Sequence, residues 1–337
     1  MSAEVMRSVQ MSAYGDAGVL TMADVKVPTP GPQDLRIAVH ATSINPVDTK
    51  VRAGYQRSVI RLSMPWALGM DVSGVVLEVG SAVTDFKVGD EVFASPSHRR
   101  MGCYAEQVVV RAEECAIKPA SITHNEAAGI PLVGLTAWNS LVDACDVGPG
   151  DRVLIQAGSG GVGTFAVQLA KHLGAEVYAT CSERNMELVR SLGADHVINY
   201  REEEFDEVAT ELDAVLDCFG GEALDRAAGA VKRGGVVAAI SPNLPMFTRK
   251  YGPWLGLLAL GATLIRQIAM AKVRHDASVR IVTRKPSGAT LAKIAALIDE
   301  GVIRPVVDRV LPLDEASNAH EYVETGRARG KVILQVR

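Results

Sequence analysis

The spacing of hydrophobic and polar positions along the chain changes twice and predicts three zones. From residue 1 to 126, short apolar runs rich in β-branched residues are separated by glycine and proline, as in a β-rich domain. From 127 to 270, apolar strands alternate with helical periods, which predicts βαβ units. The last zone, 271–337, holds a predicted helix over 288–300, capped by Ser287, and ends in the strand KVILQV. We expect this zone to return to the first domain.

The middle zone predicts a doubly wound parallel sheet. Five strands are expected in sequence order: RVLIQ, EVYAT, HVINY, DAVLDCF and GGVVAAI. Helical periods lie between them at 164–173, in RNMELVRSL and in EALDRAAGAV. The predicted fold class is therefore α/β, a Rossmann sheet plus a second, β-rich domain.

Length and net charge bear on the number of domains and on the class of partner. The chain has 337 residues, and domains usually hold about 100–200, so two domains are expected. A net charge of −4 provides no basic field, which argues against nucleic acid as a partner.

Cysteine usage and hydropathy bear on the compartment. Five scattered cysteines include no C-x-x-C pair, which indicates a reducing environment. No apolar signal region is visible at the N-terminus. The longest uncharged apolar run, 251–265, has 15 residues, whereas a bilayer span needs about 20. These features predict a soluble cytoplasmic protein.

The strongest local motif is AGSGGVG at 157–163, directly after a predicted strand and opening a predicted helix. That context makes Gly158-x-Gly160-x-x-Gly163 a dinucleotide-binding fingerprint. Gly158 permits a tight turn, Gly160 allows the backbone to approach a pyrophosphate, and Gly163 allows close packing of helix on strand. The helix N-terminus adds N–H donors and the positive end of a dipole. A purely structural glycine turn is the alternative.

The end of the second strand bears on which dinucleotide is used. An NAD site wants a carboxylate there for the ribose 2′-OH, but this strand ends in Thr-Cys-Ser. Ser182 can donate to a 2′-phosphate, and Arg184 offers charge-assisted hydrogen bonds to it. The alternatives are a helix cap for Ser182 and a solvated charge for Arg184. The pattern favours NADPH.

Several segments together resemble the zinc-independent quinone oxidoreductase branch of the medium-chain dehydrogenase/reductase superfamily: SINPVDTKVRAGY, LGMDVSGVVLEVG, VGDEVFA, GIPLVGLTAW, AGSGGVG, LGADHVINY and ARGKVILQV. Within it, DVSGVV, GVGTFAVQ, ATCS and VIRPVVD look similar to the reticulon-interacting mitochondrial NADPH oxidoreductases, and plant alkenal/enone reductases look similar too. The resemblance implies a GroES-like substrate domain beside the Rossmann domain. It also implies NADPH-dependent reduction of a quinone or an α,β-unsaturated carbonyl.

The residues indicate that no metal is bound. Zinc alcohol dehydrogenases of this superfamily have Cys where this chain has Asn45, and His-Glu where it has Met70-Asp71. Amide and thioether are poor zinc ligands. Without a Lewis acid, hydride addition that builds a delocalised enolate or hydroquinone anion is favoured over ketone reduction, which builds a localised alkoxide.

The resemblance also implies roles for individual residues. Asn45, Lys50 and Thr136 would be catalytic: Asn45 and Lys50 would orient or protonate the substrate, and Thr136 would position the nicotinamide. Many quinone reductases have Tyr at Lys50, and the usual Lys for the 2′-phosphate is replaced by Asn185. Besides Gly158, Gly160, Ser182 and Arg184, the cofactor would contact Ser159, Gly161, Val162, Tyr200, Cys218, Phe219, Ser241, Arg329, Gly330 and Lys331.

Two rival functions stay open: a non-catalytic NADPH-binding protein, and a reductase of enoyl thioesters. One further stretch, 249–285, combines eight basic residues and one acidic residue with the apolar sequence PWLGLLALGATLI. The simpler interpretation is a segment that covers the cleft, supplies a sixth strand and forms a homodimer contact, as related quinone reductases suggest. The alternative is an amphipathic patch for an anionic membrane surface.

Overall fold

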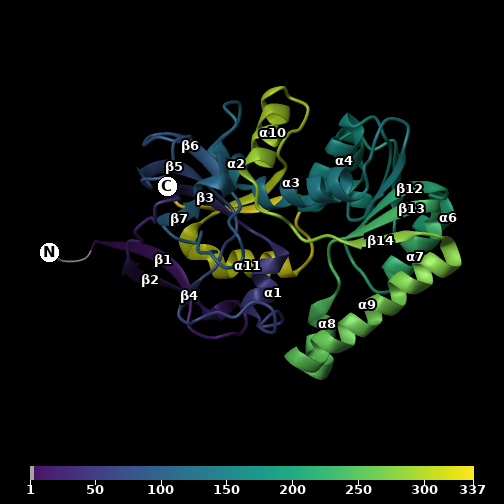
Figure 1. Ribbon diagram of the computed structural model, residues 1–337, viewed down its shortest axis with the longest axis horizontal. Coiled ribbons are helices and arrows are strands. Elements are labelled where there is room, and N and C mark those ends of the chain that lie inside the picture. The colour runs from purple at the N-terminus through teal and green to yellow at the C-terminus, as the bar shows by residue number, and fades with distance from the viewer. Residues whose placement is uncertain (1–3) are drawn as a thin grey trace. The chain divides into compact units, whose positions relative to one another are not determined.

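The computed structural model describes residues 4–337, and the chain divides into two compact units (Figure 1). Unit 1 combines the N-terminal part of the chain, up to Leu135, with Pro286–Arg337, and unit 2 is Thr136–Lys285. The sequence had placed these boundaries at 126/127 and 270/271.

Both boundaries fall later because of identifiable contacts. Helix α2 (His124–Ala128) packs on strands of unit 1, so the chain stays in that unit beyond residue 126. Strand β14 (Ser278–Ile281) pairs in parallel with β13 (Val231–Ala239), so the segment after residue 270 belongs to unit 2.

Unit 2 contains one six-stranded parallel sheet in the order β11-β10-β9-β12-β13-β14. This is the 3-2-1-4-5-6 order of the Rossmann fold, and it confirms the predicted fold class. Its other strands are β9 (Arg152–Ile155), β10 (Glu176–Cys181), β11 (His196–Asn199) and β12 (Leu212–Asp217). Its helices are α4 (Gly161–His172), α5 (Met186–Ser191), α6 (Phe205–Val208), α7 (Glu222–Ala230), α8 (Leu244–Tyr251) and α9 (Pro253–His275).

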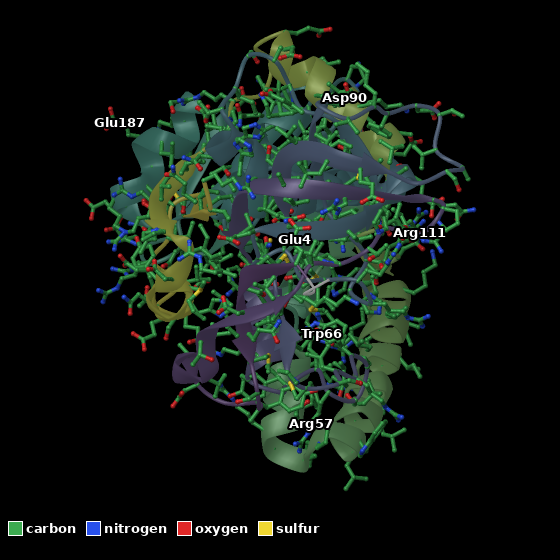
Figure 2. The ribbon with its side chains drawn as sticks, turned by 90° about the vertical axis from the view of Figure 1, so that its left-hand side faces the viewer. Glu4, Arg57, Trp66, Asp90, Arg111 and Glu187 are labelled. Carbon is green, nitrogen blue, oxygen red and sulfur yellow. The ribbon has the colours of Figure 1, made fainter. Side chains whose placement is uncertain are left out.

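Unit 1 is mostly antiparallel. A seven-stranded sheet runs β15-β16-β3-β5-β6-β8, with β7 also paired to β3, and a smaller sheet runs β2-β1-β4. Trp66 of β4 and Arg111 at the end of β7 are labelled in Figure 2. The strands are β1 (Val5–Met11), β2 (Leu20–Lys26), β3 (Asp34–Ile44), β4 (Trp66–Ala67), β5 (Val72–Val79), β6 (Glu91–Ala94), β7 (Gln107–Arg111), β8 (Cys115–Ile117), β15 (Val307–Pro312) and β16 (Lys331–Gln335).

The remaining helices are α1 (Pro46–Arg52), α3 (Pro131–Trp138), α10 (Gly288–Asp299) and α11 (Ala316–Glu324). The Ser287 side chain accepts from the Thr290 N–H, so α10 begins where the capping signal predicted. At the end of the chain, β16 pairs antiparallel with β3, with Val332 opposite Ile44. That pairing brings Lys331 to the side of Asn45, although the two lie 286 residues apart in sequence.

Candidate active site

The glycine motif forms a tight loop between β9 and α4. Ala157 has φ of 53°, and the Gly158 N–H donates to the Thr180 carbonyl at 2.8 Å. A Cβ on Gly163 would lie 2.1 Å from the Ala157 carbonyl oxygen, so only glycine fits there. The close approach expected at Gly163 is present, whereas the left-handed residue of the turn is Ala157. The loop meets the first turn of α4, which begins at Gly161 and continues through Val162.

Asn185 ties this loop to the end of β10. Its amide nitrogen donates to Ser159 Oγ at 2.9 Å and to Ser182 Oγ at 3.3 Å. Asn185 is buried, and its Oδ1 has no hydrogen-bond partner among the described residues. A buried acceptor without a partner is costly, so this atom marks a place that fits a donor from a bound molecule. The residue that replaces the usual Lys therefore holds two of the predicted cofactor-binding hydroxyls in place.

Arg184 lies in the exposed turn between β10 and α5, next to Ser182. Both follow the carboxyl end of β10, where a parallel sheet of this order binds its ligands. Tyr200 follows β11 and is 56% exposed. These three residues lie after neighbouring strands, because β10 and β11 pair directly.

Cys218, Phe219 and Ser241 follow the next strands of the same sheet. Cys218 donates its N–H to Gln156 Oε1 at 3.2 Å and its thiol to the Gln156 carbonyl, and burial raises the pKa of that thiol. A Cβ on Gly220 would lie 2.5 Å from the Ser241 carbonyl oxygen, so the loops after β12 and β13 lie against each other. Phe219 is 55% exposed beside them. Thr136 is buried in α3, where its carbonyl accepts from Ser140 Oγ.

Unit 1 contains a buried polar cluster around Asn45. Asn45 is the N-cap of α1 and is fully buried. Its Nδ2 donates to Asp71 Oδ2 at 2.8 Å, and its Oδ1 accepts from Lys331 Nζ at 2.5 Å. Lys331 Nζ also lies 3.5 Å from Asp71 Oδ2.

Asp71 is the hub of this cluster and has no solvent exposure. Its Oδ2 also accepts from Ser43 Oγ at 2.6 Å, and its Oδ1 accepts from the Leu132 N–H at 2.7 Å. Asp71 therefore joins Ser43, Asn45, Leu132 and Lys331 in one buried network. Burial lowers the pKa of Lys331, and the neighbouring Asp71 and Asp48 raise it.

Asp48 adds a second carboxyl group beside the cluster. Its Oδ2 accepts from the Asn45 N–H at 2.8 Å. Burial, with the nearby Asp71, raises the pKa of Asp48 to about 7. On the same helix, burial lowers the pKa of Lys50. A carboxyl and an ammonium whose pKa values both move toward neutrality are suited to proton transfer.

The chain's last loop has a structural role in unit 1. Arg329, Gly330 and Lys331 are predicted to close over the cofactor, and Lys331 is buried on Asn45 and Asp71. Gly330 is buried with φ of +74°, and a Cβ there would lie 2.2 Å from the Val306 carbonyl oxygen. The turn that requires glycine thus directs Lys331 inward, while Arg329 remains exposed.

Asp71 as an organising residue was missed from the sequence, where it figured only as a departure from a zinc ligand pair. Its partners Asn45 and Lys331 lie 26 and 260 residues away. No local pattern carries such long-range contacts; only the pairing of β16 with β3 brings them together.

Comparisons with known proteins agree with this geometry. The alcohol dehydrogenase GroES-like domain model matches residues 31–121, and a zinc-binding dehydrogenase model matches 192–334. NAD(P)H oxidoreductase RTN4IP1, mitochondrial, from Mus musculus is 38% identical over 327 residues, which cover 90% of this chain and 82% of that protein. The chain belongs to the quinone oxidoreductase branch of the medium-chain dehydrogenase/reductase superfamily. The predicted family and the prediction of an oxidoreductase are confirmed.

Further relatives cover nearly the whole chain. The NADPH-dependent alkenal/one oxidoreductase, chloroplastic, of Arabidopsis thaliana is 34% identical over 98% of this chain and 79% of its own length. The quinone oxidoreductase structure from Coxiella burnetii has a TM-score of 0.88 at 33% identity and covers 99% of this chain and 100% of that chain. The Escherichia coli quinone oxidoreductase complexed with NADPH has a TM-score of 0.80 at 26% identity, covering 98% and 100%.

The prediction of a cytoplasmic protein is contradicted, because these relatives are named as mitochondrial and chloroplast proteins. Unpaired cysteines report on redox conditions and not on an organelle. The expectation that the apolar segment near residues 251–265 is too short to span a bilayer also needs correction. Among the described residues, one helix, α9, is long and apolar enough to cross a membrane by length and composition.

The donor set near Asn45 does not fit the zinc that one family description implies. Asn45 Oδ1 already accepts from an ammonium, and Met70 is buried in the apolar core of unit 1. Within residues 4–337, no group of three or more His, Cys, Asp or Glu side chains could hold a metal ion. A lysine ammonium beside the would-be ligands repels a divalent cation by like charge.

Proposed function

We propose that this protein is a zinc-independent reductase that transfers hydride from NADPH to a quinone or an α,β-unsaturated carbonyl. The observation that carries the proposal is the Lys331 ammonium on Asn45 and Asp71, at positions where zinc dehydrogenases have metal ligands. A fixed internal cation takes the place of a metal there. Such a site suits a reaction whose developing negative charge is delocalised.

The predicted cofactor, NADPH, is confirmed: relatives are named NAD(P)H oxidoreductases, and structural neighbours have NADPH bound. NADPH supplies the hydride when it is bound. The residues of unit 2 fit it. Gly160 carries no side chain that would hold a pyrophosphate away from the backbone, and the N-terminus of α4, which begins at Gly161, provides N–H donors. We assign Ser182 and Arg184 to the 2′-phosphate and the unsatisfied Asn185 Oδ1 to a neighbouring donor of the cofactor.

The residues of unit 1 would supply the proton that the reduced substrate takes up after hydride transfer. We assign Lys50 as the proton donor, because a lowered pKa makes its ammonium a better acid near neutral pH. Asn45 acts as a positioning residue: its amide nitrogen and oxygen are engaged by Asp71 and Lys331, which fixes the start of α1, the helix whose last turn carries Lys50. This differs from the direct catalytic role that the resemblance implied for Asn45, since the side chain is fully buried.

A homodimer remains part of the proposal. β14 is the outermost strand of the unit 2 sheet, and edge strands offer unpaired N–H and C=O groups to a second copy. Light scattering of the purified protein measures this directly. A monomer at micromolar concentration would contradict the dimer and leave the reductase proposal intact.

The function is tested by NADPH oxidation against a soluble quinone, a free enone and an enoyl thioester. We expect turnover of the quinone or the enone, at least about tenfold faster by kcat/KM than the thioester. A Lys50→Met variant should lose kcat with little change in the KM for NADPH. Faster turnover of the thioester would replace the proposed substrate class, and no turnover of any of the three would overturn the proposal.

A further inference from the structure

The two helices α8 and α9 of unit 2 carry an apolar surface that nothing in unit 2 covers. Figure 1 shows α9 as one long helix beside α7, with α8 at one end. One side of α9 is a continuous line of exposed apolar residues with the three- and four-residue spacing of a helix face. Leu258 is 70%, Ile265 72% and Val273 80% exposed. The full line is Leu255, Leu258, Ala262, Ile265, Ala269 and Val273.

The opposite side of α9 is fixed to its own unit. Its buried residues are Gly256, Leu260, Gln267 and Ala271. Gln267 Nε2 donates to the Gly221 carbonyl and to Asp225 Oδ1, both at 2.9 Å. A Cβ on Gly256 would lie 2.7 Å from the Phe247 carbonyl oxygen, so α9 rests directly on α8. The exposed apolar line is therefore presented on a rigid support.

The charges on α8 and α9 indicate which kind of partner this apolar surface can bind. Neither α8 nor α9 contains an acidic residue, whereas together they contain Arg249, Lys250, Arg266, Lys272 and Arg274. Arg266 directly follows Ile265, and Lys272 and Arg274 flank Val273. Two copies meeting through this face would bring like charges together, which disfavours self-association. An apolar line bordered mainly by cations matches an anionic lipid surface, although Lys272 pairs with Asp276, the residue that directly follows α9.

We propose that α8 and α9 dock the protein on an anionic membrane surface, with the apolar line of α9 in the interface and the flanking cations on lipid headgroups. The helix has the length to cross a bilayer, but Arg266 and Gln267 lie near its middle. A charge at the centre of a bilayer is costly, and spanning would break the contacts of Gln267 with α7. Docking in the plane of the membrane leaves those contacts intact.

Co-sedimentation with vesicles tests the proposal. Full-length protein is mixed with two kinds of phosphatidylcholine vesicle, at low and at high salt. In one kind, about one lipid in three is phosphatidylserine, and the other contains no anionic lipid. Binding should require the anionic lipid and weaken with salt. The Arg266→Gln/Arg274→Gln variant should bind about 30-fold more weakly, since each cation near the surface contributes about 1 kcal/mol. Leu258→Ser/Ile265→Ser should weaken binding at both salt concentrations.

The matched control is Lys26→Gln/Arg190→Gln, which removes the same charge from exposed positions outside these helices. It should bind like the wild type. All variants should oxidise NADPH with a soluble quinone or enone as the wild type does, so membrane docking and the reductase activity are judged separately. Equal binding to uncharged vesicles, no binding at low salt, or an equal loss in the control would overturn the proposal. Conversion of a dimer to a monomer by Leu258→Ser/Ile265→Ser would instead make this face a contact between copies.

Discussion

The glycine loop of unit 2 and the Asn45 cluster of unit 1 are two polar sites built in different ways. The loop is made largely of backbone and depends on the absence of side chains, as at Gly163. The Asn45 cluster is made of side chains from β3, from the residues just before α1 and β5, and from β16, and these side chains satisfy one another away from water. The glycine loop leaves backbone N–H donors available for a ligand, whereas in the Asn45 cluster nearly all side-chain donors and acceptors bond to one another.

That difference predicts different responses to mutation. A backbone site fails when atoms are added, because nothing can move aside. A side-chain cluster fails when one partner is removed, because the others remain buried and unpaired.

Removal of the Lys331 ammonium should have the largest effect. Lys331→Met leaves the buried Asp71 without its counter-charge and should lower the free energy of unfolding by about 3–5 kcal/mol. Asp71→Asn/Lys331→Met should recover part of the loss, and the double-mutant cycle measures the coupling by urea unfolding. Lys171→Met, from the surface pair with Asp195, is the control and should cost less than about 1 kcal/mol. Equal losses for the two lysines would show that the Asn45 cluster is not held by this pair.

Addition of one carbon to the glycine loop comes next. Gly163→Ala places a Cβ against the Ala157 carbonyl and should cost about 3 kcal/mol, with loss of NADPH binding. Gly148→Ala is the control, because its Cβ would meet no atom within 4 Å. Both are compared by urea unfolding and by NADPH fluorescence titration. If Gly163→Ala bound NADPH normally, the loop would not be the cofactor site.

Low pH should remove the stability that unit 1 gains from a buried neutral histidine, while the raised pKa of Asp48 acts in the opposite direction. His320 has no exposure and contacts the Tyr104 hydroxyl at 3.1 Å, and burial lowers its pKa from 6.5 to about 3. Between pH 6.5 and about pH 3, His320 binds a proton in the unfolded chain but not in the folded one. The stability that depends on neutral His320 is therefore fully present above pH 6.5 and falls as pH drops. At pH 5 the loss is about 2 kcal/mol. Urea unfolding of His320→Gln at pH 7.5 and pH 5 should show a smaller pH dependence than the wild type; the same dependence would contradict the assignment.

The smallest of these effects concerns the choice of cofactor. Arg184→Ala should raise the KM for NADPH about tenfold, from the loss of a charge-assisted contact with the 2′-phosphate, and leave the KM for NADH unchanged. Arg190→Ala, at an exposed position in α5, serves as the control. Equal changes for both cofactors would remove Arg184 from the phosphate site.

The same contrast explains what could be predicted from sequence. The Rossmann order and the glycine loop follow from periodicity and from a motif whose residues are contiguous, so both could be predicted. The Asn45 cluster could not, because Lys331 reaches Asn45 only through the pairing of β16 with β3. The length of α9 was also missed: several of its large apolar residues, among them Leu258, Ile265 and Val273, are exposed, so burial on unit 2 alone does not explain its pattern.

The central claim is that Lys331 fills the place of a metal ion in a working reductase. The direct measurement is the rate of NADPH oxidation, with the preferred quinone or enone, by protein that has been extensively chelated and checked for zinc by elemental analysis. We expect full activity at less than about one zinc per ten chains, and no gain when zinc is added back. Activity that disappears on chelation and returns with zinc would contradict the account.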